Sequence, residues 1–283
     1  MIPSGDEPGT LPQWIKYGET FLTGHGIPNA RNNAEWILCH VLGCERLALY
    51  TADADKHGWN RDYLEKLERR ANREPLQYII GTTEFMSLPF ETPAGVFVPR
   101  PETEILVEAA EKRLRVLPLE RGMTVLDLCC GSGVIAVSLA ARTSGLVATA
   151  VDVSEPAVEA TRRNASLNGV AGRVEAVRSE ATSFLETGEY SAILCNPPYI
   201  ETGEMQNLAP EVHDHEPHVA LDGGADGLDF YRRIIPLLPP RLAEGGFVGF
   251  EIGDTLGPAV TELLHDNGFH DVLILHDLSN LPR

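Results

Sequence analysis

The stretch that decides the fold is Val-Leu-Asp-Leu-Cys-Cys-Gly-Ser-Gly at residues 125–133. Its apolar start predicts a strand, its glycines predict a turn, and the apolar residues that follow predict a helix. Gly131 and Gly133 let a ligand approach the backbone at places where a Cβ atom would clash. The free N–H groups at the start of the helix suit an anion. The stretch therefore predicts a strand, a ligand-binding turn and a helix in succession.

From Thr124 onward, strand-like apolar runs alternate with helical runs. Such alternation predicts an α/β fold with a doubly wound, mostly parallel sheet, in which ligands bind beyond the carboxyl ends of the strands. The expected strands are residues 125–126, 147–151, 174–177, 192–195, 247–252 and 272–275, and the expected helices are residues 133–141, 156–167, 231–242 and 260–266.

The earlier part of the chain predicts a separate helical domain over residues 1–73. Apolar side chains recur there at helical spacing, Gly43 stands where a helix C-cap glycine belongs, and Asn60 is a candidate N-cap. No catalytic constellation occurs there, so we expect a small bundle that docks a partner. Residues 74–98 predict a β-hairpin linker, and the α/β domain is expected over residues 99–283. The β-like runs of the linker are residues 82–85, 88–91 and 95–98.

The composition favours a protein or small-molecule substrate over nucleic acid. The formal net charge is −18, and the densest basic runs are pairs such as Arg69-Arg70. Proteins that hold nucleic acid by its phosphates usually show basic patches. An acidic surface suits a basic partner, although solubility alone also explains it. No apolar run is long enough to span a bilayer and Met1 to Thr10 lack a signal pattern, so we expect a cytoplasmic protein without membrane contact.

The cysteines and histidines do not predict a metal site. The 5 cysteines have spacings that match neither a zinc site nor a disulfide framework, so reduced thiols are expected. His213, His215 and His218 imitate a metal cluster, but they lie among acidic residues and a proline. We expect a flexible segment over the substrate cleft there instead.

The glycine turn also fits the dinucleotide fingerprint, because Gly131, Gly133 and Ala136 have its spacing. A ribose-binding acid is expected downstream, and Asp152 follows at about the right distance. An NAD-dependent dehydrogenase or a non-catalytic nucleotide-binding module is therefore an alternative. Asp127 weighs against a dinucleotide, because its carboxylate would repel a pyrophosphate and attract the cationic amine or sulfonium of a methionine derivative.

Two acids follow the second and third expected strands. Asp152 can accept hydrogen bonds from both hydroxyls of a ribose. Glu180 can accept from an adenine amino group, although a solvated loop carboxylate explains this residue nearly as well.

The motif Asn-Pro-Pro-Tyr at residues 196–199 ends the fourth expected strand. Two consecutive prolines fix the backbone and remove two donors. The side-chain oxygen of Asn196 and the carbonyl of Pro197 are then rigid acceptors, which suits a planar NH2 group with two hydrogens to donate. Tyr199 can stack on that group. The motif predicts a site for an amide or an exocyclic amine.

The Asp127 turn and the Asn-Pro-Pro-Tyr motif together resemble the class I methyltransferases that act on such NH2 groups. Further stretches narrow the resemblance to the release factor glutamine methyltransferases, the PrmC/HemK family. The resemblance covers nearly the whole chain. The stretches are Arg-Glu-Pro-Leu-Gln-Tyr-Ile at 73–79, Glu-Phe-Met at 84–86, Val-Pro-Arg-Pro-Glu-Thr-Glu at 98–104, Glu-Pro at 216–217, Ala-Leu at 220–221, Gly-Gly-Ala-Asp-Gly-Leu at 223–228 and Glu-Ile-Gly at 251–253.

This resemblance implies a class I methyltransferase fold with a small N-terminal helical bundle. It implies transfer of a methyl group from S-adenosylmethionine, leaving S-adenosylhomocysteine, to the N5 atom of the glutamine in the Gly-Gly-Gln loop of class 1 release factors. The residues expected to bind the cofactor are Asp127, Cys129, Cys130, Gly131, Ser132, Gly133, Asp152, Glu180, Ala181 and Asn196. Those expected to bind the substrate are Asn196, Pro197, Pro198 and Tyr199, and of these Asn196, Pro197 and Tyr199 are the expected catalytic residues.

The chain departs from the family pattern at three places. Cys129 and Cys130 stand where a glycine and a threonine are common, so the first residue of the turn is expected to avoid a glycine-only conformation. Ala181 stands where an aromatic residue often covers the adenine. Residues 277–283 stand where the family usually continues into a final edge strand, so either the chain is cut short or its sheet lacks that strand.

The expected mechanism depends on positioning. An amide nitrogen is a poor nucleophile, and hydrogen bonds from its NH2 group to Asn196 and Pro197 would orient it and stabilise the positive charge that develops on it. No strong base is required before transfer. A ribosomal-protein glutamine methyltransferase and an adenine-N6 nucleic-acid methyltransferase remain alternatives, because their targets also present a planar NH2 group.

Overall fold

The structure is a computed structural model that describes residues 9–51, 59–117 and 122–283. Most of the Met1 to Thr10 stretch, for which no signal peptide is expected, lies outside these residues. The chain divides into two compact units. The first is Met1–Gly81 with Pro210–His215, and the second is Thr82–Ala209 with Glu216–Arg283. The hairpin that we expected to be a linker thus groups with the α/β unit.

The helical unit has a core of its own, which includes the buried side chains of Trp14, Ile37 and Tyr63. Gly43 ends the second helix with a φ of +61°, as its predicted C-cap role requires. The prediction for Asn60 is wrong, because Asn60 lies within the third helix and its amide oxygen accepts from the N–H of the next residue. The elements are α1 (Leu11–Gly24), α2 (Ala30–Leu42), η1 (Arg46–Tyr50), α3 (Trp59–Ala71) and α4 (Leu76–Ile80).

A short segment from late in the chain belongs to this helical unit. It includes α9 (Pro210–His213), and Glu211 on it accepts from the Arg70 guanidinium at 2.7 Å. Arg70 is buried on α3 and also donates to the side chain of Asn33 at 2.8 Å. A buried arginine needs such partners, so the ion pair attaches the segment to the helices.

The α/β unit opens with an antiparallel hairpin of β1 (Thr82–Phe85) and β2 (Leu88–Glu91), as predicted. The third expected run, residues 95–98, is not a strand. The chain turns there, with Gly95 at a φ of +83°, and the Val98 N–H donates to the Glu216 carboxylate at 3.1 Å instead of to a neighbouring strand.

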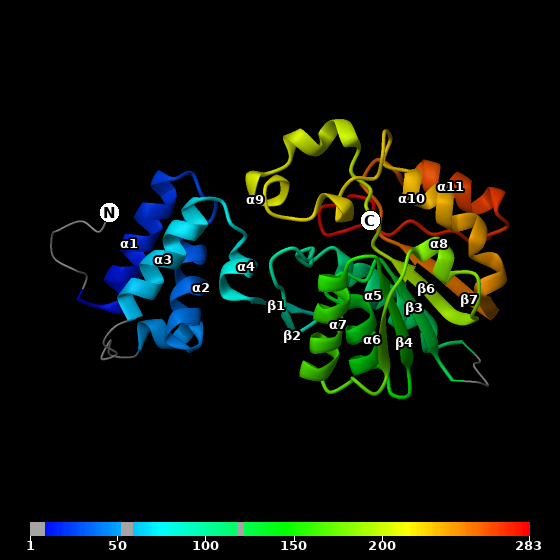
Figure 1. Cartoon of the computed structure of the whole chain (residues 1–283), viewed down its shortest axis with the longest axis horizontal. Helices are drawn as coiled ribbons and strands as arrows, with labels where there is room; N and C mark the ends of the chain where they lie inside the picture. The colour runs from blue at the N-terminus through cyan, green and yellow to red at the C-terminus, as the bar shows by residue number, and fades with distance from the viewer. Residues whose placement is uncertain (1–8, 52–58, 118–121) are drawn as a thin grey trace. The chain divides into compact units, whose positions relative to one another are not determined.

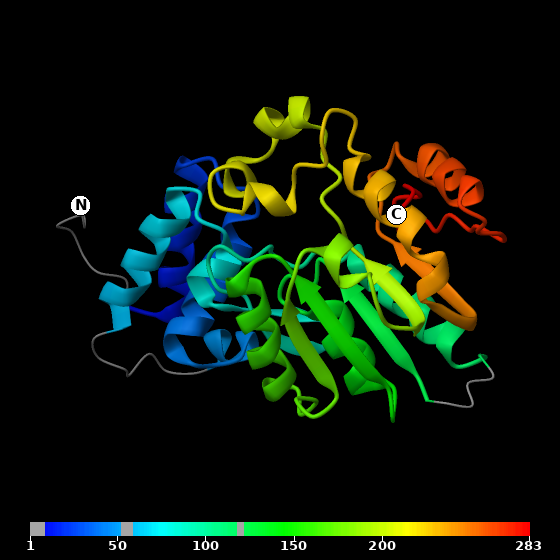
Figure 2. The same ribbon diagram turned by 45° about the vertical axis from the view of Figure 1, so that its right-hand side comes forward.

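The main sheet has five parallel strands in the order β5-β4-β3-β6-β7, and Figure 2 shows them side by side. The chain builds one half outward from β3 and then returns to add β6 and β7 on the other side. This arrangement is the doubly wound parallel sheet that the alternating pattern predicts. The strands are β3 (Thr124–Leu128), β4 (Val147–Asp152), β5 (Val174–Arg178), β6 (Tyr190–Cys195) and β7 (Leu242–Phe250).

Helices cover both faces of the sheet (Figure 1), and alternate residues of each strand supply the two cores. Val125 packs toward α5, α6 and α7, whereas Leu126 and Leu128 pack toward α8 and α10. The helices are α5 (Thr103–Leu114), α6 (Val134–Arg142), α7 (Glu155–Leu167), α8 (Ala181–Phe184), α10 (Asp229–Ile234) and α11 (Gly257–Asp266), with short 3-10 turns η2 (Thr202–Asn207), η3 (His218–Ala220), η4 (Ile235–Leu237) and η5 (Pro239–Arg241).

Two predictions in the last third of the chain need correction. The run over 231–242 is predicted to be mostly helix with proline interruptions, but it is α-helical only up to Ile234, because prolines at 236, 239 and 240 turn its continuation into 3-10 turns. The strand expected over 272–275 does not pair with any strand in the described residues. Leu273 there is 82% exposed, so its apolar pattern does not reflect burial in the sheet.

Candidate functional site

The site lies where the order of the strands reverses. The chain leaves β3 toward β4 on one side and leaves β6 toward β7 on the other, so the loops that follow β3 and β6 diverge. Ligands of parallel sheets bind in the crevice at such a point. Leu128 pairs with Cys195 in the sheet, so the glycine turn and Asn196 begin at neighbouring positions.

The glycine turn is held by its own backbone. The Cys130 N–H donates to the Val151 carbonyl at 3.1 Å, and the Gly133 N–H donates to the Cys130 carbonyl at 2.7 Å. Cys129 has a φ of +58°, in the left-handed region that residues other than glycine enter at a cost of about 1 kcal/mol. The cysteine therefore stays outside the conformations that only glycine adopts, but it holds a strained position.

The two glycines of the turn have different roles. A Cβ on Gly133 would lie 2.7 Å from the Thr161 side chain, so this glycine is required by packing within the protein. A Cβ on Gly131 would meet nothing within 4 Å. Its φ of +55° and the space beside it fit close approach of a ligand to the backbone.

Two buried polar atoms around this turn lack a partner within the described residues. They are Oδ1 of Asp127 and Oγ of Ser132. The other Asp127 oxygen accepts from the Ala136 N–H at 3.0 Å. Buried polar groups are nearly always paired, so these two atoms suit a ligand with donors. The residues of the turn thus fit the cationic methionine end of S-adenosylmethionine.

Asp152, at the end of β4, fits a ribose. Each of its carboxylate oxygens accepts one backbone N–H, from Gly131 and from Ser154, both at 2.9 Å. A carboxylate oxygen has two lone pairs, so each keeps one for a ribose hydroxyl. Burial raises the pKa of Asp152, and the backbone N–H groups oppose that shift by stabilising the charged form.

Glu180 and Ala181 begin α8. The Glu180 carboxylate caps this helix by accepting from the Thr182 N–H at 2.9 Å, and it also pairs with Arg233 at 2.6 Å. Ala181 packs against the apolar cluster of the sheet face that α8 covers. The expected contacts of both residues with adenine stay predictions.

The Asn-Pro-Pro-Tyr motif follows β6 directly. Asn196 is partly buried, and its NH2 group donates to the Thr103 hydroxyl at 3.1 Å. In the described part of the chain its carbonyl oxygen has no partner, so it is available as an acceptor. Pro197 is buried, and the Tyr199 hydroxyl donates to the Glu251 carboxylate at 3.2 Å.

Three glycines of the resembling stretches pack against Tyr199. A Cβ on Gly223 would lie 2.7 Å from the Tyr199 Cα, and a Cβ on Gly227 would lie 2.4 Å from its carbonyl oxygen. A Cβ on Gly253 would be 3.4 Å from the ring. At Gly223 and Gly227 only a residue without a side chain allows so close an approach, so these two glycines fix the position of the tyrosine, whereas the distance at Gly253 is an ordinary van der Waals contact.

Sequence reasoning missed two residues of this site, Thr103 and Glu251. Both are only 2% exposed, and they touch Asn196 and Tyr199. The signal for them was present, because they lie in the stretches 98–104 and 251–253 that carry the family resemblance.

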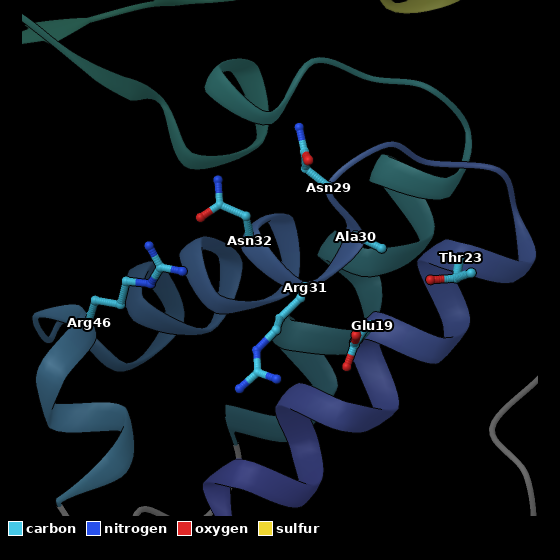
Figure 3. Close-up of a pocket in the computed structure, with 7 residues that line it drawn as sticks. All are labelled: Glu19, Thr23, Asn29, Ala30, Arg31, Asn32 and Arg46. Carbon is cyan, nitrogen blue, oxygen red and sulfur yellow. The ribbon is translucent and has the colours of Figure 1, made fainter.

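A pocket lies in the helical unit, between α1 and the start of α2 (Figure 3). Arg31 and Arg46 on its wall both bond to the buried Glu35 carboxylate, so their charges are already neutralised. None of the expected site residues lines this pocket.

The described residues contain no group of three or more potential metal ligands. Of the three histidines that imitate a metal cluster, His213 forms a hydrogen bond to the carboxylate of the neighbouring Asp214 at 2.6 Å. Within the same residues, no helix is both long and apolar enough to cross a membrane.

The buried Asp127 predicts a pH-dependent stability. Burial raises its pKa from 3.8 to about 8. Between these two values the native state keeps a proton that the unfolded chain has released, so stability falls as pH rises through this window and levels off above it. Asp127→Asn keeps an acceptor for the Ala136 N–H without a charge. The variant is expected to gain stability over the unchanged protein from about pH 5 to about pH 8, while its cofactor affinity falls.

Thermal unfolding without cofactor, at several pH values in this window, measures the effect. A variant that loses stability relative to the unchanged protein as pH rises would contradict the raised pKa of the buried Asp127 in the cofactor-free protein.

Two family models match the chain when its sequence is compared with known protein families. The family model "PrmC N-terminal domain" matches residues 13–81, and the model "Methyltransferase small domain" matches residues 88–221. The first match ends at the boundary of the helical unit, and the second spans both the glycine turn and the Asn-Pro-Pro-Tyr motif.

Curated relatives match almost end to end. A release factor glutamine methyltransferase of Geobacter sulfurreducens is 37% identical over 97% of this chain and 95% of its own length. Enzymes of the same name from Thermodesulfovibrio yellowstonii and Streptomyces coelicolor are 36% and 38% identical, over 88% and 93% of this chain and 89% and 92% of their own lengths.

Proposed function

Because this chain belongs to the family of release factor glutamine methyltransferases, we propose that it methylates the glutamine in the Gly-Gly-Gln loop of a class 1 release factor. The enzyme is an S-adenosylmethionine-dependent methyltransferase, and the acceptor in the proposal is the side-chain amide nitrogen, N5. The observation that supports this acceptor is the orientation of the Asn196 amide. Its NH2 group donates to Thr103, and its oxygen has no partner in the part of the chain that the structure describes.

The site residues act by binding and orienting. When bound, S-adenosylmethionine supplies a methyl group activated by a sulfonium. The Asn196 oxygen, with the Pro197 carbonyl, accepts from the NH2 group of the target glutamine and stabilises the positive charge that develops on its nitrogen. Tyr199 packs beside the planar amide, and Pro198 holds the backbone rigid.

We further propose that Asp152 binds the ribose and that Asp127 and residues 129–133 bind the methionine end of the cofactor, with Glu180 and Ala181 beside the adenine. The open face of Gly131 and the unpartnered atoms of Asp127 and Ser132 support this assignment. The helical unit, in the proposal, docks the release factor.

Membership of a methyltransferase family removes the dehydrogenase and the binding-module alternatives. An adenine-N6 enzyme also binds a planar NH2 group, but the net charge of −18 disfavours a polyanionic substrate. A ribosomal protein is the remaining rival, because its glutamine would present the same amide.

A methyl-transfer assay with a tritium-labelled cofactor tests the proposal. A release factor, ribosomal proteins and DNA are offered side by side to the same enzyme. We expect label in the release factor, and none in a release factor whose Gly-Gly-Gln glutamine is replaced by alanine. Preferential labelling of a ribosomal protein or of DNA would overturn the proposed substrate.

A further inference from the structure

Thr103 and Glu251 form a chain of hydrogen bonds behind the Asn-Pro-Pro-Tyr motif. The Thr103 hydroxyl donates to Oε2 of Glu251 at 2.6 Å and accepts from the Asn196 NH2 group at 3.1 Å. Oε1 of the same carboxylate accepts from the Tyr199 hydroxyl at 3.2 Å. One buried carboxylate is therefore connected to both polar side chains of the motif.

The backbone of Glu251 is fixed against the end of β6. Its N–H donates to the Cys195 carbonyl at 2.9 Å, which continues the pairing of β7 with β6. Its carbonyl accepts from the buried Tyr231 hydroxyl at 2.7 Å. The backbone that carries the Glu251 carboxylate is consequently held in place beside Asn196.

The direction of these hydrogen bonds determines the orientation of the Asn196 amide. An ionised carboxylate only accepts, so the single hydroxyl proton of Thr103 is used on Glu251. The Thr103 oxygen can then only accept, and it must face the NH2 side of Asn196 rather than the oxygen. The amide oxygen of Asn196 is thereby turned the opposite way.

We propose that Thr103 and Glu251 are positioning residues that set Asn196 as an acceptor for the amide NH2 group of the substrate. The inference rests on the proposed function, in which that NH2 group belongs to a glutamine. A flipped Asn196 would present its own NH2 group to the substrate NH2 group, so two donors would face each other. The two orientations of the Asn196 amide have the same shape, and the chain of hydrogen bonds selects the one that presents the oxygen to the substrate.

Thr103→Val removes the hydroxyl and keeps the shape, whereas Thr103→Ser keeps the hydroxyl. We expect Thr103→Val to lower kcat about tenfold or more, the value of one lost hydrogen bond at an oriented group, and Thr103→Ser to restore most of it. The affinity for S-adenosylmethionine, measured by calorimetry, is expected to be unchanged in both variants.

Glu251→Gln is a sharper test because it changes polarity and not size. A glutamine can donate to Thr103, which lets the hydroxyl donate to Asn196 and favours the flipped amide. We expect a loss of kcat at least as large as in Thr103→Val. Thr92→Val is the matched control, because Thr92 is 0% exposed in the same unit and its hydroxyl has no partner in the described residues.

The outcomes are separable. Normal kcat in Thr103→Val or in Glu251→Gln, with release factor as substrate, would overturn the inference while leaving the proposed function intact. An unchanged enzyme that does not methylate release factor would refute the proposed function instead. Equal losses of kcat in Thr92→Val and Thr103→Val would overturn the inference, because they would show that loss of any buried threonine hydroxyl in this unit has the same effect. If Thr103→Val unfolds, Glu251→Gln with a normal melting temperature decides the matter.

Discussion

Replacing Asn196 with alanine is expected to lower single-turnover methyl transfer by about 10²–10³-fold, the usual effect of removing one preorganised group that stabilises transition-state charge. Among the described residues the Asn196 oxygen has no partner, and Asn196 follows β6 at a position next to the start of the glycine turn after β3. Its hydrogen bond to the substrate strengthens as positive charge grows on the nitrogen. The Pro197 carbonyl remains in the variant, so some activity is expected to persist.

Cofactor affinity is expected to change little in Asn196→Ala, because the residues proposed for the ribose and the methionine end lie on β3, β4 and their loops. The measurement pairs single-turnover transfer to a release factor with calorimetry of cofactor binding. Asn207→Ala, an exposed asparagine on η2, is the control and should behave normally. Near-normal transfer in Asn196→Ala would remove the proposed glutamine-binding role of the motif.

The second large effect is expected at Asp152. Asp152→Ala removes two acceptors proposed for the ribose hydroxyls, and hydrogen bonds to a charged group contribute about 1.5–3 kcal/mol each. The dissociation constant for S-adenosylmethionine should rise by roughly a hundredfold or more. The backbone N–H groups of Gly131 and Ser154 also lose their acceptor, so loosening of the glycine turn adds to the loss.

Calorimetry of cofactor binding measures this change, and circular dichroism confirms that the variant is folded. Glu175→Ala, an exposed carboxylate on the neighbouring strand β5, is the matched control. Comparable affinities of Asp152→Ala and Glu175→Ala for the cofactor would mean that the ribose is bound elsewhere.

The sequence predicted the parallel sheet and its order of elements well, because the strands of such a sheet are apolar on both faces. Val125, Leu126 and Leu128 are all fully buried, so the run around them is nearly continuously apolar, which is typical of a strand in a parallel sheet. The glycine turn was predictable for a similar reason, since Gly131 and Gly133 both have the positive φ that glycine favours.

Predictions failed where tertiary contacts override local pattern. Residues 272–275 are as apolar as a strand but pair with no strand among the described residues, and within residues 95–98 the Val98 N–H donates to the distant Glu216 carboxylate. The grouping of residues 210–215 with the helical unit depends on an ion pair between Arg70 and Glu211, 141 positions apart. The local sequence pattern around either residue cannot predict such a pair.

The sequence predicted the part of the site that forms a local motif, and it missed the part that only tertiary contacts assemble. Asn196 and Tyr199 form a compact motif with an unusual composition, so their role can be inferred from their spacing. Thr103 and Glu251 are individually ordinary residues, separated by 148 positions, and only the fold joins them through a hydrogen bond. The fold brings the start of α5, which carries Thr103, together with the carboxyl ends of β6 and β7.

The most direct measurement is tandem mass spectrometry of a release factor after incubation with the enzyme and S-adenosylmethionine. We expect a single added methyl group on the side-chain amide of the Gly-Gly-Gln glutamine, and about 10²–10³-fold less of it when Asn196→Ala is used for the same short incubation. A methyl group on any other residue of the release factor, or a release factor that stays unmodified while another substrate is methylated, would contradict it.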